Sequence, residues 1–341
     1  MKNMLVTLPM VLFLACEAQD INPPKPGTPS TNSDYESIGI TGDKNDVTVP
    51  TEFGIALVGG STDVDEALQW MIGKATGGDV VIIRASGSTG YNEYIYGLGP
   101  VNSVETLLID SRAKAINENV GKRIREAEML FIAGGDQANY VNFWKDTPVS
   151  EAIQYLIRVK KIPIGGTSAG CAVLSDVIFD ALHDTVISPD ALSNPYDSRV
   201  SLSKSFMSTP FLENTIADQH YSQREREGRH VTFMARMIND FGVTNPKGIG
   251  VDERTAVCVG QDGNAKVFGT NKAYFITTTT PPETCTANTP LTWDQGDHAL
   301  QVYIFQGSSV GTPAFNLQAW PSQTPDEYWF VENGELKRTV N

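Results

Sequence analysis

Short apolar runs that end in glycine alternate along this chain with segments of helical periodicity. The first run is GIALVGG at residues 54–60, and the segment 63–75 that follows has apolar residues near helical spacing behind an acidic start. The same pattern recurs at residues 79–87, 104–127, 128–137 and 161–179. Strands that are apolar on both faces and alternate with amphipathic helices indicate a parallel sheet covered by helices on both sides. The pattern therefore predicts an α/β fold with three layers, α/β/α.

The C-terminal third has a different pattern. Residues 248–269 alternate as strand, turn and strand, with an Asp-Gly turn at residues 262–263, and predict an antiparallel extension of the sheet. Asp252 and Glu253 at its start could reach the functional edge of the sheet, but we favour a structural role for them. Residues 281–341 are richer in Pro, Thr and Asn, and we expect a C-terminal extension packed on a catalytic domain over residues 51–280.

The N-terminus has the features of an export signal. One lysine precedes an apolar run over residues 4–15, which is shorter than the roughly 20 residues of a membrane-spanning helix. We predict a lipoprotein-type signal peptide over residues 1–15, with Cys16 lipidated as the first mature residue, although simple cleavage or a buried N-terminal helix would also fit. The protein would then be exported and anchored by lipid to a bacterial membrane, at the periplasmic or cell surface. Residues 16–50, rich in Pro, Ser and Asn, would form a flexible linker.

Composition excludes several functions. The chain of 341 residues contains 26 Lys and Arg against 40 Asp and Glu, a net charge of −14, which disfavours binding to nucleic acids. Neither GxxxxGK[ST] nor GxGxxG is present, and no cysteine spacing indicates zinc, so we predict no metal and no cofactor. One disulfide among Cys171, Cys258 and Cys285 remains open.

The segment GTSAG at residues 166–170 carries the first candidate for chemistry. It fits G-x-S-x-G between a predicted strand and a predicted helix, the context in which a strained turn exposes a serine hydroxyl. Glycines two residues to either side of Ser168 remove Cβ atoms that would collide in such a turn. The amide of Ala169 would form part of an oxyanion hole. Ser168 is therefore the predicted nucleophile, with an ordinary serine-containing turn as the alternative.

A serine nucleophile needs a general base, and the chain contains four histidines. His220 lies in DQHYSQREREGR, at a predicted strand end that leads into a helix. The arginines that follow it could instead form a solvated helix face paired with the neighbouring glutamates. The nucleophile upstream makes His220 the predicted base.

Four motifs in this order, GGDQ, GTSAG, DQHYSQREREGR and GIGVDERTA, resemble the cyanophycinase family of serine peptidases, relatives of the aspartyl dipeptidase peptidase E. The resemblance runs from about residue 54 to 275. It implies a flavodoxin-like, amidotransferase-like fold and hydrolysis of peptide bonds involving aspartate, without metal or cofactor. The family's namesakes cleave the β-aspartyl-arginine polymer cyanophycin. A homodimer is plausible, because relatives dimerise.

The resemblance also implies roles for individual residues. Ser168 would be the nucleophile and His220 the base, and Gln137 would contact substrate near the scissile bond. The residues that would recognise the substrate's aspartyl and arginyl groups are Asp218, Gln219, Arg224, Arg226 and Arg229. The family's triad acid comes from a loop after the nucleophile, so Asp184 is the first choice and Asp190 the second. Cyanophycin-cleaving members use glutamate there, and none occurs between residues 170 and 211.

The sequence thus predicts a serine peptidase that cleaves aspartyl peptide bonds through an acyl-enzyme, with β-aspartyl-arginine bonds as a candidate substrate. Two alternatives stay open. One is a catalytically silent, surface-anchored binding protein of the same fold, and the other is a serine amidase or esterase with a different substrate.

Overall fold

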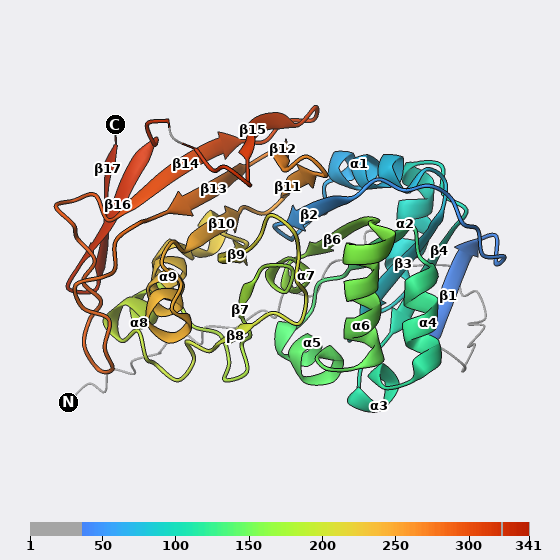
Figure 1. Ribbon diagram of the computed structural model, residues 1–341, viewed down its shortest axis with the longest axis horizontal. Coiled ribbons are helices and arrows are strands. Elements are labelled where there is room, and N and C mark those ends of the chain that lie inside the picture. The colour runs from blue at the N-terminus through green and yellow to red at the C-terminus, as the bar shows by residue number, and fades with distance from the viewer. Residues whose placement is uncertain (1–35, 322, 341) are drawn as a thin grey trace, which may run out of the picture.

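The computed structural model describes residues 36–321 and 323–340 (Figure 1). The predicted signal peptide, Cys16 and the first part of the predicted linker lie outside the described residues. The helices are α1 (Asp65–Ala75), α2 (Gly90–Leu98), α3 (Arg112–Ala115), α4 (Glu118–Glu126), α5 (Gln137–Trp144), α6 (Pro148–Tyr155), α7 (Ala169–Ala172), α8 (Ser188–Ser193) and α9 (Glu227–Phe241). A π-helical turn over Leu156–Lys160 extends α6, and a 3-10 turn covers Ser222–Arg224.

The first sheet has the strand order β1-β4-β3-β5-β6-β2-β11-β12-β15. Its central strands are parallel, and β11, β12 and β15 continue it in antiparallel fashion. The strands are β1 (Ser37–Gly42), β2 (Gly54–Val58), β3 (Asp79–Arg84), β4 (Ser103–Leu108), β5 (Met129–Ile132), β6 (Pro163–Thr167), β11 (Thr255–Gly260), β12 (Asn264–Gly269) and β15 (Thr312–Asn316). The predicted α/β class, with a mainly parallel sheet and an antiparallel extension, is therefore confirmed.

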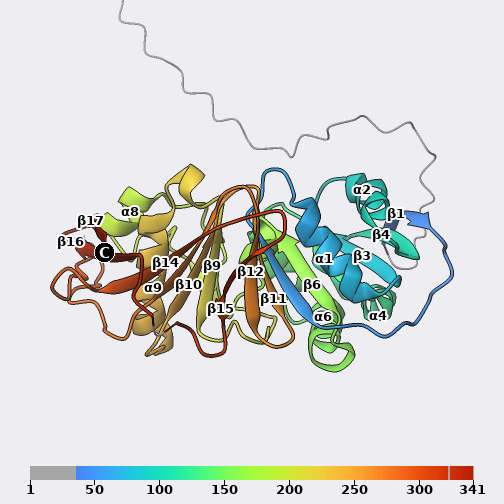
Figure 2. The same ribbon diagram turned by 90° about the horizontal axis from the view of Figure 1, so that it is seen from above.

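A second sheet, which the sequence analysis did not separate from the first, has the order β17-β16-β14-β13-β10-β9-β7-β8. Only β7, β9 and β10 are parallel neighbours in it. Its strands are β7 (Val177–Phe179), β8 (Leu202–Lys204), β9 (Thr215–Gln219), β10 (Lys247–Val251), β13 (Lys272–Thr277), β14 (Leu300–Gln306), β16 (Glu327–Glu332) and β17 (Glu335–Val340). The two sheets follow each other along the long axis of the molecule (Figures 1 and 2).

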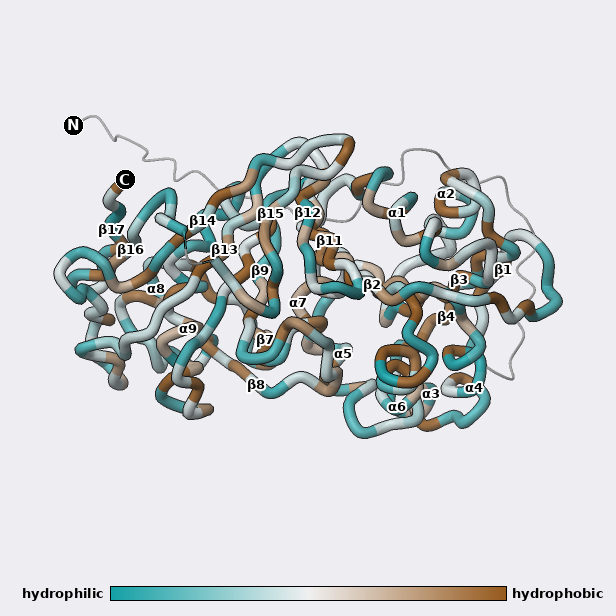
Figure 3. The backbone as a smooth tube through the Cα atoms, turned by 45° about the horizontal axis from the view of Figure 1, so that its top comes forward, coloured by the Kyte–Doolittle hydropathy of each residue, from teal (hydrophilic) through white to brown (hydrophobic). Residues whose placement is uncertain are grey.

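Three apolar cores hold these layers together. One lies under α1 and α2 on one face of the first sheet, and one lies under α8 and α9 on the second sheet. The largest contains α4, α5 and α6 as well as residues of both sheets, such as Leu57 and Phe275, so it joins the two sheets. Hydrophobic stretches are prominent along central strands such as β2, β6 and β11, and hydrophilic stretches along many of the connecting loops (Figure 3). The largest core is therefore continuous beneath the ends of the strands where the two sheets meet.

Two predicted elements need correction. Within the predicted linker, Ser37–Gly42 forms β1 and pairs antiparallel with β4, because an edge strand needs only a few residues of extended chain to complete a ladder. The helix predicted after Ser168 is only four residues long, and Val177–Phe179 forms β7 instead. β-Branched and aromatic residues in this second segment suit a strand better than a helix.

None of the helices in the described part of the chain is both long and apolar enough to cross a bilayer. The cysteines of this part, Cys171, Cys258 and Cys285, are buried and unpaired, and burial raises the pKa of each thiol. The disulfide that the sequence left open is not formed among them.

Candidate active site

Ser168 sits in a strained turn between β6 and α7. Its φ of 52° and ψ of −117° place a non-glycine residue in a region that L-residues rarely adopt. The turn is held by its amide, which donates to the carbonyl of Val58 at 3.0 Å. A Cβ on Gly166 would lie 2.5 Å from the carbonyl carbon of Gly170, and one on Gly170 would lie 2.1 Å from the oxygen of Ile132. Both glycines are therefore required by close backbone approach, as the sequence motif indicated.

His220 faces this hydroxyl. Its Nε2 lies 2.9 Å from Ser168 Oγ, and its backbone amide donates to the carbonyl of Gly59 at 2.8 Å. A Cβ on Gly60 would lie 2.5 Å from the imidazole, so the Gly59–Gly60 turn also makes room for the histidine. The serine and histidine that the sequence singled out separately thus meet at one edge.

The carboxylate at the other ring nitrogen belongs to Glu253, whose Oε1 lies 2.7 Å from Nδ1 of His220. With Nδ1 protonated toward Glu253, Nε2 is free to accept the proton of Ser168. Strands β9 and β10 are parallel neighbours, so the residues after them, His220 and Asp252–Glu253, emerge side by side. The position of Glu253 just after a strand was a signal for this role.

The prediction of Asp184 as the acid is wrong in this structure, and so is the second choice, Asp190. Asp184 lies in an exposed turn where its Oδ1 accepts the amide of Thr185 at 2.7 Å. Asp190 forms an exposed ion pair with Arg199 at 3.0 Å. The loop after the nucleophile leads into the second sheet, and Glu253 occupies the position beside Nδ1 of His220.

The backbone amide of Ala169, which was predicted to form part of the oxyanion hole, lies next to Ser168. Ala169 begins α7 and is buried, and the first amides of a helix have no acceptor within it. On the other side of Ser168 lies the GGDQ loop, since a Cβ on Gly134 would be 3.4 Å from the Cβ of Ser168. The Gln137 side chain in this loop donates to the carbonyl of Phe179 at 3.3 Å and is buried, so it braces β7.

Asp218 and Arg229 do not face a ligand, which corrects the expectation that they recognise substrate groups. The Arg229 guanidinium donates to both carboxylate oxygens of Asp218, at 2.6 and 2.8 Å, and both side chains are about 2% exposed. Burial alone would raise the pKa of Asp218, but Arg229 holds it below its ordinary value. The physical reason is that a buried carboxylate needs a buried partner, and the nearest guanidinium supplies it.

Of the three other predicted binding residues, Gln219 is buried and Arg226 is largely enclosed, its side chain being 12% exposed. Arg226 donates to the carbonyl of Gln219 at 2.8 Å, and burial together with the nearby Arg229 lowers the pKa of Arg226 to about 9. The Gln219 side chain is buried, and its Oε1 has no hydrogen-bond partner among the described residues. Arg224 is different, because its side chain is 38% exposed and its Nε lies 3.9 Å from Glu253. Arg224 is thus the arginine of this run that a ligand can reach.

Replacing Asp218 with Asn should destabilise the protein by about 3–5 kcal/mol, because it leaves the Arg229 cation buried without its counter-charge. Urea unfolding of Asp218→Asn measures this free energy. Asp190→Asn is the matched control, since its ion pair with Arg199 is exposed and its loss should cost no more than about 1 kcal/mol. Equal losses for the two variants would contradict the structural role of the buried pair.

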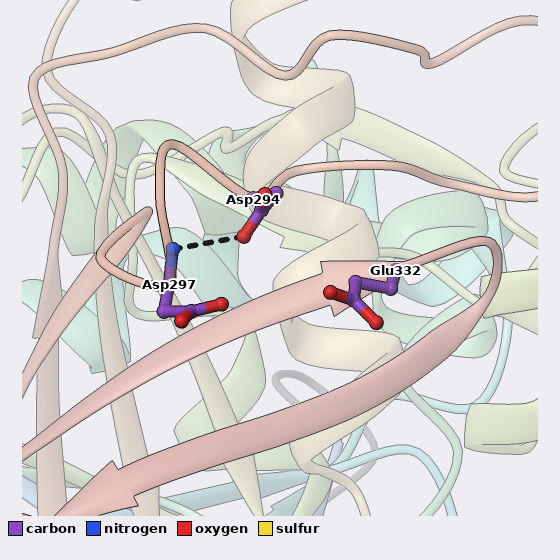
Figure 4. A group of neighbouring side chains, drawn as sticks. All are labelled: Asp294, Asp297 and Glu332. Carbon is purple, nitrogen blue, oxygen red and sulfur yellow. Dashed lines mark hydrogen bonds between the residues drawn. The ribbon is translucent and has the colours of Figure 1, made fainter.

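Among the described residues, one group of acidic side chains is close enough to share a cation: Asp294, Asp297 and Glu332 (Figure 4). It lies on loops and a strand end of the second sheet, away from Ser168. The Glu332 carboxylate is already paired with Lys337, and Asp297 and Glu332 are exposed. Exposed acidic groups of this kind are common without an ion, so the group has no assigned part in the chemistry.

Comparison with known proteins gives matches over the same region of the chain. Residues 102–267 match the model of Peptidase family S51, and all four motifs noted in the sequence lie within that range. The chain is 29% identical to a cyanophycinase of Trichormus variabilis over 205 residues, which cover 59% of this chain and 62% of the relative. It is 28% identical to a cyanophycinase of Synechococcus elongatus over 187 residues, covering 54% and 52%. The matched region thus spans less than two thirds of these relatives.

A solved structure of a peptidase from an acI-B1 Actinobacterium is also similar, with 18% identity and a TM-score of 0.48 over 66% of this chain and 91% of that one. The family resemblance predicted from the motifs is confirmed by the family model and the curated relatives.

Proposed function

We propose that this chain, whose residues 102–267 match the model of Peptidase family S51, is a serine peptidase whose catalytic residues are Ser168, His220 and Glu253. The observation that carries the proposal is the continuous chain of hydrogen bonds from Ser168 Oγ through both nitrogens of His220 to Glu253. A nucleophile bonded to a base, which is in turn oriented by a carboxylate, is the arrangement that activates a serine hydroxyl.

The reaction would proceed through an acyl-enzyme. His220 takes the proton of Ser168 as Oγ attacks the scissile carbonyl, and Glu253 stabilises the imidazolium that forms. The Ala169 amide donates to the oxyanion, and His220 then returns the proton to the departing amine. The same histidine deprotonates the water that attacks the acyl group, and it then gives this proton to Ser168 Oγ as the ester bond breaks and the acid leaves. Neither step requires any group besides the substrate, water and these residues.

The proposed substrates are peptides with aspartyl residues, including β-aspartyl-arginine bonds, because the curated relatives are cyanophycinases. Arg224 is the accessible cation beside His220 and would bind a substrate carboxylate. One observation favours a second candidate, a serine amidase or esterase with another substrate. Asp218 and Arg229, expected to bind the arginyl and aspartyl groups, are paired with each other.

The test is a panel of substrates given to the purified protein: cyanophycin, β-Asp-Arg, α-Asp dipeptides, non-acidic dipeptides and a p-nitrophenyl ester. Release of free amine from the aspartyl peptides, at rates well above those for the non-acidic ones, would support the proposal. Preference for non-acidic peptides or the ester would support the second candidate. Binding of peptides without turnover of any substrate would identify a silent binding protein and overturn both.

The pH dependence of this activity follows from the environment of His220. Burial, reinforced by the Arg224 cation and opposed by Glu253, lowers the pKa of His220 to about 4. A general base must be neutral, so kcat/KM should hold through pH 6 and decline only as the pH falls through about 4. Arg224→Gln removes a cation and should move this acidic limb to higher pH, whereas Arg112→Gln, a surface variant on α3, should not. An acidic limb near the ordinary histidine value in the unmodified protein would contradict this electrostatic description.

A further inference from the structure

Besides Arg224, a second cation, Arg84, lies at the edge of the first sheet that carries Ser168. Arg84 ends β3, and β3, β5 and β6 are consecutive parallel strands. Their register places Arg84 in one row with Thr167, the residue before Ser168, two strand spacings or about 10 Å apart. The row before it consists of Ile83, Ile132 and Gly166.

The guanidinium of Arg84 is held by neutral groups only. Its Nε and Nη1 donate to the carbonyls of Ser86 and Ser88, in the loop that follows β3. A Cβ on Gly87, whose φ is +99°, would lie 2.0 Å from Nη2, so the loop can wrap the guanidinium only with glycine there. Within the described part of the chain, no carboxylate forms an ion pair with Arg84, although the chain carries a net charge of −14. A half-buried cation is thus fixed in place with no counter-ion.

The loop that holds Arg84 and the GGDQ loop are neighbours along the edge that carries Ser168. A Cβ on Gly135 would lie 3.6 Å from Ser86 Oγ, and a Cβ on Gly134 would lie 3.4 Å from the Cβ of Ser168. The Arg84 loop therefore borders the GGDQ loop, and the GGDQ loop borders the nucleophile. A substrate lying along this edge would pass from one to the next.

The direction of the substrate follows from the position of the base. His220 contacts Gly60, which follows β2, and β2 lies on the opposite side of β6 from β5 and β3. The leaving amine must lie next to His220 to receive its proton, so the acyl part of the substrate extends toward Gly134 and Arg84. Arg84 is consequently on the acyl side.

We propose that Arg84 is a specificity-determining residue that binds a carboxylate on the residue supplying the scissile carbonyl. For a β-linked aspartyl residue this is its α-carboxylate, and a planar guanidinium can hold it with two hydrogen bonds. The inference rests on the proposed peptidase function. It adds the side chain that recognises the carboxylate of the residue on the acyl side of the scissile bond. Arg229, which the motif pattern offered for such a task, is occupied by Asp218.

The experiment measures binding in the full chain with Ser168→Ala, so that no turnover intervenes. The probes are β-Asp-Arg and the same dipeptide with its aspartyl α-carboxylate converted to the carboxamide, titrated by calorimetry. The carboxylate form should bind about tenfold or more tightly than the amide, and Arg84→Gln should abolish this preference. Arg112→Gln is the matched control, because Arg112 also donates to backbone carbonyls, those of Asn142, Lys145 and Asp146, and should leave the preference unchanged.

Arg84 also braces its own loop, so Arg84→Lys, which keeps the charge, accompanies the glutamine variant and should retain part of the preference. Equal affinity for the two probes, a preference that survives in Arg84→Gln, or no binding of either probe would overturn the assignment. Because binding is read without the nucleophile, failure of the unmodified protein to hydrolyse peptides would count against the proposed function and not against Arg84.

Discussion

Replacing Ser168 with alanine is expected to lower kcat for the best substrate by about 10⁴-fold or more, with little change in stability. The hydroxyl is bonded to His220 and supplies the nucleophile, so no other described side chain can take over its bond to the acyl group. Because the two residues act as a unit, the double variant Ser168→Ala/His220→Ala should be hardly less active than either single one. Steady-state rates and thermal unfolding of the same preparations measure both expectations.

Ser193→Ala is the matched control, since Ser193 is exposed on α8 and its hydroxyl only donates to the carbonyl of Asp190. This variant should keep full activity. Turnover by Ser168→Ala comparable to that of Ser193→Ala would remove Ser168 from the mechanism, and losses that multiply in the double variant would argue that the serine and histidine work independently.

Glu253→Gln should be the second most damaging change, with a loss in kcat of about 10²–10⁴-fold. The amide can still hydrogen-bond to Nδ1 of His220, but it does not stabilise the imidazolium and can favour the tautomer with the proton on Nε2, which cannot accept the proton of Ser168. The rate ratio between this variant and the unmodified enzyme, measured above pH 6, tests the expectation.

Asp184→Asn provides the comparison, because Asp184 was the acid that the family pattern pointed to. Its carboxylate accepts only the amide of Thr185 in an exposed turn, so its replacement should change kcat by less than about twofold. A larger loss for Asp184→Asn than for Glu253→Gln would return the role of the acid to the loop after the nucleophile.

The proposed nucleophile and base were predictable because each lies in a local motif with its own steric or chemical signature. The glycines around Ser168 and the polar run around His220 stand within a few residues of the groups they serve. The acid is set by a different kind of fact, the parallel pairing of β9 with β10, which brings Glu253 beside His220 from 33 residues away. The position of Glu253 just after a strand is a local signal, but the sequence does not mark which strand β10 pairs with, so the expected chain order directed attention to Asp184.

The exposure of the three arginines after His220 could not be predicted from the sequence either. Arg224, Arg226 and Arg229 look equivalent in the sequence, yet one is accessible and another is enclosed with Asp218. The difference arises because α9 begins at Glu227 and turns Arg229 inward against β9, which depends on tertiary packing. The sequence analysis did not assign the strands of the second sheet to a separate sheet for a similar reason. β10 and β11 are divided by only three residues but pair with different neighbours.

The proposed catalytic groups come from both sheets, with Ser168 at the end of β6 and His220 at the end of β9. Strand β2, the neighbour of β6, pairs with β11 across almost 200 residues, Val58 lying opposite Ala256. Contacts that span so much of the chain form slowly during folding, because a long loop must close before they gain anything. Enzymatic competence is therefore a late product of folding in this protein, since neither half of the molecule can assemble the proton-transfer chain before the other has docked.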